Sequence, residues 1–312
     1  MGMDRRRGDF DPRAPLPPGA VDHLRWDNPI LLDLVRRYRE HGSPVNAHSQ
    51  WAHSFRSDLD LRYFRGDNCY LRQLSNFTGG LEASFTRYAD YLAPRDARGL
   101  LELVAEDGGF GCWAVDYRRR RLISRDLLES VNEIGFLDRA WNLFDRTGVT
   151  VLDIGAGYGR LGHRVAEAVP GLDRYYCVDA VPESTFVCSY YLDHRGVSER
   201  VAVVPLDELD SLAGKRIDLA VNIHSFSEMP HAAIRAWLEW LAGHEVPALF
   251  VISNTRERVL SREADNSQRD ATPLLARYGY RRVVAEPIVA EPAAFADLGI
   301  DDHFLLFRRS AG

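Results

Sequence analysis

The sequence predicts an α/β protein, with a doubly wound, Rossmann-like sheet and a C-terminal antiparallel strand in residues 148–312. Three observations support this fold class. After Gly148, short apolar runs alternate with amphipathic stretches, which is typical of parallel βαβ units. The first run, TVLDIG, leads directly into a glycine-rich turn, as in folds that hold a nucleoside at a tight strand-to-helix connection. Only a short linker separates the last two runs, which favours an antiparallel pair that closes the sheet.

The alternation defines the expected elements of this part. The expected strands, in chain order, are TVLDIG, RYYCVDA, RVAVVPL, IDLAVNIH, ALFVISN, YRRVVAEPIV and HFLLFRR. The clearest helical stretches between them are RLGHRVAEAVP, ESTFVCSYYLDHRG and MPHAAIRAWLEWLAGH.

The first half of the chain has a different texture. Residues 1–20 are rich in arginine, aspartate, proline and glycine, which predicts a flexible tail. Residues 21–147 show no clear strand pattern, so we expect a mainly helical cap that binds the acceptor. Asn28 or Asp27 can cap the first helix, Ser124 can cap the last, and Gly148 provides the stop. The expected helices are DNPILLDLVRRYREHG, GLEASFTRYADYLA, RDARGLLELVAEDG and SRDLLESVNEIGFLDRAWNLFDRTG.

Composition narrows the function classes. The 312 residues are 46% hydrophobic and 27% charged, as in soluble globular proteins. A net charge of −6 disfavours a sequence-independent grip on nucleic acid. No apolar run approaches the length of a membrane span, and the N-terminus lacks the apolar region of a secretory signal. The four cysteines form no CxxC pair, which fits a reducing cytoplasm.

The glycine-rich turn leaves the ligand open between two cofactors. It contains Gly155-x-Gly157-x-Gly159 and also Gly157-x-Gly159-x-x-Gly162, the spacing of dinucleotide-binding proteins. Such glycines permit close approach of a ligand to the backbone, so they fit either a nicotinamide dinucleotide or S-adenosylmethionine.

Further features favour S-adenosylmethionine. Asp153 precedes Gly155 by two residues, and Asp-x-Gly-x-Gly-x-Gly is the pattern of class I methyltransferases. The bulky Tyr158 and Arg160 fit poorly with two phosphates at a helix N-terminus. Asp179, 24 residues after Gly155, can accept hydrogen bonds from both ribose hydroxyls, a feature shared with NAD enzymes.

The corner after the third strand and the closing strand pair point the same way. In methyltransferases a corner such as Leu206-Asp207 commonly covers the adenine, and an acidic side chain there accepts from its amino group. The methyltransferase sheet also carries one reversed strand near its edge, which suits the expected C-terminal pair.

Four stretches resemble a particular family. SRDLLESVNEIGFLDR, VLDIGAGYGRLGHRV, YYCVDA and VNIHSFSEMP together are similar to the bacterial sugar O-methyltransferases, over residues 124–254. The resemblance implies a class I methyltransferase fold and methyl transfer to a hydroxyl, on a deoxysugar or a related natural-product scaffold.

These features give a set of expected cofactor-binding residues. Arg160 can pair with the methionine carboxylate or lie along its helix, and Asp207 can instead cap the segment ELDSLAG. The full set is Asp153, Gly155, Ala156, Gly157, Tyr158, Gly159, Arg160, Asp179, Ala180, Leu206, Asp207, Asn222 and Ile223.

The segment VNIHSFSEMP follows the fourth strand, where groups at the carboxyl edge of the sheet face a ligand. His224 is the expected general base, because the ordinary pKa of its side chain suits that role. Glu228 is expected to orient His224 or to bind an acceptor hydroxyl. The alternative is that His224 bonds to a loop carbonyl and Glu228 supplies negative charge to a helix start.

The acceptor is expected to bind residues of the N-terminal half. The candidates combine aromatic faces with hydrogen-bonding groups, although the aromatic rings could simply be buried against helices. They are Trp51, Tyr63, Arg65, Asn68 and Tyr70. No metal is expected, because Asp301, Asp302 and His303 read as a solvated turn before a strand.

The sequence therefore predicts an S-adenosylmethionine-dependent O-methyltransferase acting on a small molecule, with no nucleic-acid or membrane partner and a homodimer as one option. Alternatives that remain open are N-methylation of an amine, an NAD-dependent oxidoreductase, and a non-catalytic binding protein.

Overall fold

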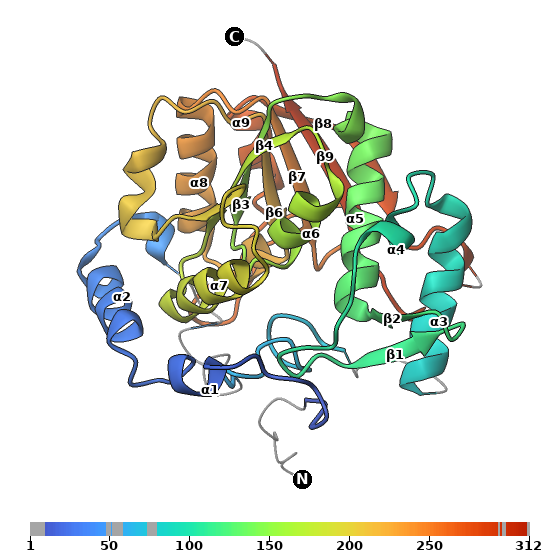
Figure 1. Cartoon of the computed structure of the whole chain (residues 1–312). Helices are drawn as coiled ribbons and strands as arrows, with labels where there is room; N and C mark the ends of the chain where they lie inside the picture. The colour runs from blue at the N-terminus through green and yellow to red at the C-terminus, as the bar shows by residue number, and fades with distance from the viewer. Residues whose placement is uncertain are drawn as a thin grey trace.

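The computed structural model describes residues 10–47, 51, 59–73, 80–292, 294 and 298–310. A seven-stranded sheet organises the C-terminal half, in the order β5-β4-β3-β6-β7-β9-β8 (Figure 1). The strands are β3 (Val149–Ile154), β4 (Leu172–Val178), β5 (Val201–Val203), β6 (Leu219–Ile223), β7 (Ala248–Ser253), β8 (Tyr280–Pro287) and β9 (His303–Arg309).

The pairing directions give this sheet the class I methyltransferase fold. Strands β5, β4, β3, β6 and β7 run parallel, while β9 is antiparallel to both β7 and β8. The order reverses between β3 and β6, so the carboxyl ends of these two strands border the crevice in which such sheets bind ligands. All seven expected strands and the closing antiparallel pair are confirmed.

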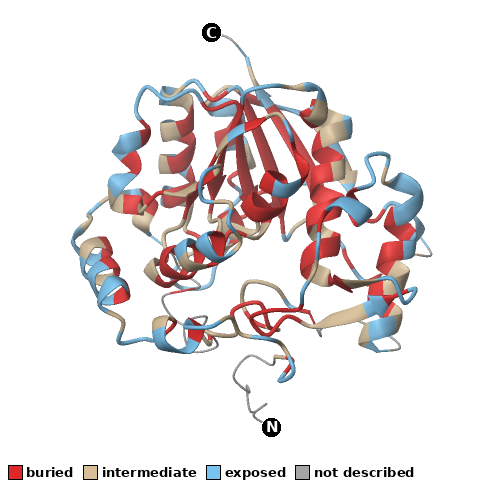
Figure 2. Ribbon diagram, viewed as in Figure 1, coloured by how far each residue is buried: buried red, intermediate tan, exposed pale blue. Residues whose placement is uncertain are grey.

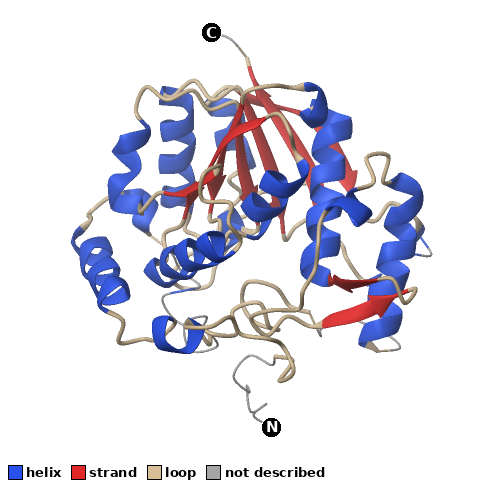
Figure 3. Cartoon of the chain, viewed as in Figure 1, coloured by secondary structure: helices blue, strands red, loops and turns tan. Residues whose placement is uncertain are grey.

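Helices flank the sheet on both sides of this reversal (Figure 3). Helix α5 packs through Phe136, whose ring stacks on Phe250 of β7 and Phe304 of β9 at 5.2 and 4.6 Å. The sheet and α5 thus share one buried core, which Figure 2 shows along the strands. The helical elements here are α5 (Arg125–Trp141), η5 (Leu143–Asp145), α6 (Arg160–Ala168), α7 (Pro182–His194), η6 (Leu206–Leu212), η7 (Ser225–Glu228), α8 (His231–Gly243) and α9 (Thr272–Arg277).

The N-terminal half contains more than helices. Its elements are α1 (Ala20–His23), α2 (Pro29–Glu40), η1 (Pro44–Asn46), α3 (Leu81–Leu92), η4 (Ala93–Arg95), α4 (Leu100–Leu103), β1 (Ala114–Tyr117) and β2 (Arg121–Ser124). Strands β1 and β2 form an antiparallel hairpin that the sequence analysis missed. Arg118 and Arg119 form its turn with positive φ angles of 53° and 55°.

Helix boundaries follow local capping. Asn28 caps α2 by accepting from the Ile30 amide, and Ser124 caps α5 by accepting from the Leu127 amide, as expected. Helix α5 ends earlier than expected, because Asn142 adopts a left-handed conformation with φ 57°.

The stretch expected as one helix over RDARGLLELVAEDG is helical only in α4. There the Asp96 carboxylate accepts from the Leu100 and Leu101 amides at 2.7 Å each, which starts a new turn. Beyond α4, Val104 is extended, so the helix stops.

The described part of the expected tail is packed against the chain. The Phe10 ring stacks on Tyr63 at 3.9 Å, and the Asp11 amide donates to the Gly111 carbonyl at 3.2 Å. Residues 1–9 lie outside the described residues. Within the described residues, no helix combines the length and apolar character needed to cross a bilayer.

Candidate functional site

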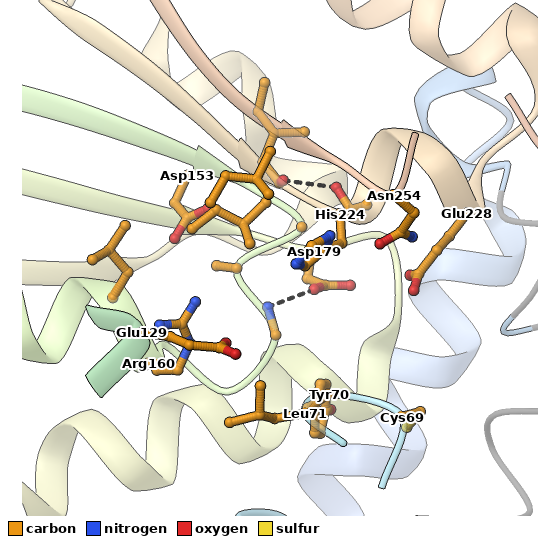
Figure 4. Close-up of a pocket in the computed structure, with 18 of the residues that line it drawn as sticks. Cys69, Tyr70, Leu71, Glu129, Asp153, Arg160, Asp179, His224, Glu228 and Asn254 are labelled. Atoms are coloured by element: carbon orange, nitrogen blue, oxygen red, sulfur yellow. Dashed lines mark hydrogen bonds between the residues drawn. The ribbon is translucent and has the colours of Figure 1, made fainter. Parts of the chain in front are cut away.

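A cavity of about 400 Å³ lies at the carboxyl ends of β3, β4, β6 and β7 (Figure 4). Its walls also include residues of α5, the segment 69–72, and the residues around the start of β9. In Figure 4, Glu129 and Arg160 lie at one end of the cavity and Glu228 lies at the other, with Asp179 and His224 between them. The volume is in the range of a small-molecule site.

Gly155 closes the connection between β3 and the glycine-rich turn. Its φ is +79°, and a Cβ there would overlap the Ser225 side chain. The Ser225 hydroxyl donates to the Ile154 carbonyl at 2.9 Å, so the loops after β3 and β6 touch at this point. Only glycine fits both the backbone conformation and this contact.

The rest of the turn divides between ligand and packing. Ala156, Gly157 and Tyr158 line the cavity. Gly159 does not appear among the lining residues, because it faces α7: a Cβ on it would lie 2.8 Å from the Cys188 sulfur. Gly159 therefore permits the approach of a helix rather than of a ligand.

Asp179 lies at the end of β4, opposite this turn. One carboxylate oxygen accepts from the Gly157 amide at 2.9 Å and the other accepts from the Val181 amide at 2.8 Å. Burial raises the pKa of Asp179 to about 7. Each oxygen retains a further lone pair, so the ionised group can accept two more hydrogen bonds. Ala180 and Val181 continue the same wall.

Three charged groups form the end of the cavity near α5. Arg160 lines the cavity, and its guanidinium binds both oxygens of Glu133 at 2.8 and 2.9 Å. Asp153 accepts from the Tyr175 hydroxyl at 2.9 Å. Burial raises the pKa of both Glu133 and Asp153 to about 7. The Tyr158 hydroxyl donates to Asp126 behind the cavity wall, so its ring rather than its polar end faces the ligand space.

His224 follows β6 and adopts φ 62°, a conformation that non-glycine residues adopt rarely and mostly at functional sites. Its amide donates to the Ile252 carbonyl at 2.7 Å, which fixes the residue against β7. Its Nδ1 is buried and has no hydrogen-bond partner among the described residues. Burial lowers the pKa of the imidazole. A neutral ring with a free nitrogen beside a cavity is suited to take a proton.

Glu228 lies at the other end of the cavity. It accepts from the Trp51 indole at 3.1 Å, and burial raises its pKa to about 7. The Tyr70 ring lies 5.2 Å from Trp51, and the Tyr70 hydroxyl bonds to Ser184 at 2.9 Å. Trp51 and Tyr70 therefore line the part of the cavity beside Gly157 and Asp179, where the sequence analysis expected a cofactor rather than an acceptor.

Three residues expected to bind the cofactor have other partners. Asn222 is fully buried behind the cavity, where its amide group donates to the Ile154 carbonyl at 2.9 Å and joins β6 to β3. Asp207 pairs with Arg37 of α2 at 2.7 Å, and the Leu206 amide donates to the Tyr38 hydroxyl at 2.8 Å. Helix α2 covers this corner, so neither residue lines the cavity. Ile223 does line it.

Three residues expected to bind the acceptor lie outside the cavity lining. Tyr63 stacks on Phe10, and the Asn68 side chain donates to the Phe64 carbonyl at 2.9 Å. Arg65 is 1% exposed and pairs with Glu106 and Asp126 at 2.8 and 3.1 Å. These residues shape the segment 59–73 from within, because their polar groups bond to the protein itself.

Sequence reasoning missed several polar lining residues. They are Arg125, Glu129, Glu133, Asn254 and Asp302. Arg125, Glu129 and Glu133 share one face of α5, at the three- and four-residue spacing that the helix itself predicts. Asp302 reaches the cavity through the pairing of β9 with β7, which no local pattern reveals.

Carboxyl groups outnumber guanidinium groups around the cavity. Glu133 pairs with Arg160, and Glu129 pairs with Arg125 at 2.6 Å. The lining contains six carboxyl groups (Glu129, Glu133, Asp153, Asp179, Glu228 and Asp302) and three arginines (Arg72, Arg125 and Arg160). Among the described residues, no group of three or more His, Cys, Asp or Glu side chains is arranged to hold a metal ion.

Comparison with known proteins adds similarity of fold. No family model and no curated protein sequence matches the chain. Magnesium protoporphyrin IX methyltransferase from Synechocystis is 14% identical, with a TM-score of 0.43 over 76% of this chain and 100% of that one. A SAM-dependent methyltransferase from Aquifex aeolicus is 18% identical, with a TM-score of 0.41 over 58% and 96%. The cyclase SpnF is 16% identical, with a TM-score of 0.41 over 73% and 95%. Likeness of this degree does not identify a ligand or a reaction for this chain.

Proposed function

We propose that this chain binds S-adenosylmethionine in the cavity and transfers its methyl group to a hydroxyl of a small molecule, such as a sugar or a glycosylated natural product. One observation carries the proposal: the glycine-rich turn and Asp179 border a cavity in which carboxyl groups exceed guanidinium groups. A nucleoside bearing a cationic sulfur complements such a cavity, because opposite charges attract strongly where water is excluded.

The same charge balance disfavours a nicotinamide dinucleotide. A dinucleotide brings two phosphate groups, which need free donors and positive charge at the start of the helix after the turn. Here Arg160, the first residue of α6, already binds Glu133, and the Gly157 amide already donates to Asp179. The pair Glu133–Arg160 instead suits the ammonium and carboxylate groups of a methionine end.

Each part of the bound nucleoside would have a defined partner. The free lone pairs of Asp179 would accept from the two ribose hydroxyls, and Trp51 and Tyr70 would cover the sugar and base. The segment 59–73 would thus act as part of the cover over the ligand. This assignment moves Trp51 and Tyr70 from the acceptor to the cofactor.

The chemistry then needs alignment and a base. S-adenosylmethionine supplies an activated methyl group, so the protein mainly has to hold the acceptor oxygen in line with it and exclude water. His224 would accept the proton of the acceptor hydroxyl while the oxygen–methyl bond forms and the sulfur–methyl bond breaks, with its electron pair left on sulfur. A general base contributes about 10²–10⁴-fold to such a step.

Equilibrium binding tests the cofactor. Titration calorimetry should give saturable binding of S-adenosylhomocysteine, with dissociation constants of about 1–100 μM as for typical small-molecule sites, and no binding of NADH. Binding of NADH alone would overturn the proposal. For the reaction, an acceptor library of sugars, glycosides and amines is screened for release of S-adenosylhomocysteine. Turnover only on amines would redirect the proposal to N-methylation.

A further inference from the structure

The strand register brings two residues together that lie 78 positions apart in the sequence. Ile223 of β6 pairs with Ile252 of β7, so His224 lies beside Ser253. On the other side of β7, Ser253 pairs with His303 of β9, which places Asp302 at the same edge. Both side chains line the cavity. The Asp302 backbone is anchored as well, because its carbonyl accepts from the Ile288 amide at 2.9 Å.

Other charged groups that act on His224 are already engaged. They come from α5 and α6: Glu129 binds Arg125 at 2.6 Å, and Arg160 binds Glu133 at 2.8 Å. Asp301, next in the chain, pairs with Arg256 at 2.9 Å on the surface. Within the described residues, the Asp302 carboxyl has no such hydrogen-bonded partner, so it is the carboxylate that remains available to the imidazole.

We infer that Asp302 is the positioning residue for His224: its carboxylate selects the ring orientation and tautomer of the imidazole and stabilises the imidazolium that forms. The inference rests on the proposed function, in which His224 takes the proton of the acceptor. The orphaned Nδ1 of His224 and its rare backbone conformation show that the ring is held at a fixed place without a protein hydrogen bond of its own.

The electrostatics agree with this geometry. Burial lowers the pKa of His224, and the Asp302 carboxylate is the largest influence that opposes this effect. Burial likewise raises the pKa of Asp302, and His224 opposes that rise. Each group thus favours the charged form of the other.

The first test is a titration of His224 by NMR, with labelled histidine and assignment by His224→Ala. In Asp302→Asn, which keeps the shape of the side chain, the pKa of His224 should fall by about one pH unit, because an attractive charge is lost. Asp301→Asn is the matched control and should leave it unchanged. An unchanged pKa in D302N would overturn the inference, and this readout needs no turnover.

The second test is kinetic, once an acceptor is found. D302N should lower kcat by about 10- to 100-fold, within the range attributed to general-base catalysis, and should leave the KM for S-adenosylmethionine unchanged. The acidic limb of the kcat profile should move to lower pH, whereas a merely structural defect would lower the plateau without moving the limb. In a His224→Ala background, D302N should have no further effect, because the two residues act as a unit.

The two failures are distinguishable. If wild-type protein binds no S-adenosylhomocysteine, the proposed function fails whatever His224 titrates with. If wild-type protein is active and D302N moves neither the His224 titration nor the limb of the profile, the role of Asp302 fails alone. Thermal unfolding of each variant excludes a folding defect as the cause.

Discussion

At the scale of single residues, the turn after β3 separates two demands on glycine. Gly155 and Gly148 both have positive φ angles, +79° and +65°, so alanine strains the backbone at either position. At Gly148 nothing lies within 4 Å of the missing Cβ, whereas at Gly155 the Ser225 side chain occupies the space. Gly155 is therefore fixed by packing between two loops as well as by conformation.

This difference predicts unequal losses of stability. Gly148→Ala should lower the free energy of unfolding by about 1–2 kcal/mol, the cost of the left-handed conformation. Gly155→Ala should cost a further 1–3 kcal/mol, roughly, for the overlap with Ser225, and should also weaken S-adenosylhomocysteine binding. Urea unfolding and calorimetry of both variants check this. Equal losses in the two variants would show that the loops separate without cost.

Asp179 gives a prediction about the pH dependence of binding. Its pKa is raised to about 7 by burial, and only the ionised carboxylate has lone pairs for both ribose hydroxyls. Binding of S-adenosylhomocysteine should therefore weaken as pH falls from 8 to 6. Asp179→Asn should weaken binding at pH 8 by about 1.5–3 kcal/mol and should flatten the dependence on pH.

Asp173→Asn is the control, because Asp173 lies on the same strand with its side chain exposed. It should bind like the wild type at every pH. A full pH dependence in Asp179→Asn would assign the titration to another carboxyl group, such as Glu228.

At the scale of elements, local patterns predicted what local forces decide. The seven strands and α5 were predictable because apolar periodicity and end caps act within a few residues. The β1–β2 hairpin was not, since its strands are short and partly exposed, and its turn consists of arginines rather than glycine or asparagine. The segment 59–73 was taken for an acceptor surface because its aromatic and polar residues look alike whether they face a ligand or the protein.

Arg65 shows how that segment is held. Its guanidinium binds Glu106 and Asp126, and all three groups are excluded from water. Arg65→Ala would leave two carboxylates without this partner and should lower the free energy of unfolding by about 3–5 kcal/mol. Because Tyr70 and Trp51 depend on this segment, we also expect weaker binding of S-adenosylhomocysteine.

Arg62 provides the matched control within the same segment. It pairs with Asp60 at 3.1 Å, but both side chains are exposed, so Arg62→Ala should cost less than about 1 kcal/mol. Unfolding curves for the two variants compare a buried with an exposed ion pair. Losses of similar size would mean that Arg65 does not hold the segment in place.

At the scale of the whole molecule, the site is a product of topology. Asp153, Asp179 and His224 follow or end consecutive parallel strands, so their meeting at one edge was predictable from the sequence. Glu133 and Asp302 arrive through the docking of α5 and the antiparallel insertion of β9, and these depend on contacts between distant parts of the chain. The same assembly buries several carboxyl groups together.

This burial has a consequence for stability. Glu133, Asp153, Asp179 and Glu228 each have a pKa raised to about 7, whereas the same groups titrate near 4 in the unfolded chain. The folded protein therefore binds more protons than the unfolded chain between these values, and its stability falls as pH rises through 7. Histidines with lowered pKa values act in the opposite sense only below about pH 6.5, so the window from 6.5 to 8 isolates the carboxyl groups.

Urea unfolding without ligand should thus give a lower free energy at pH 8 than at pH 6.5. The limiting slope is about 1.4 kcal/mol per pH unit for each titrating group. Glu228→Gln removes one of the four groups and should reduce the slope, while Asp116→Asn, on an exposed position of β1, should leave it unchanged. A stability that rises with pH across this window would mean that these carboxyl groups are ionised in the folded protein before any ligand binds, and the attraction of the cavity for a sulfonium would then carry no coupled loss of protons.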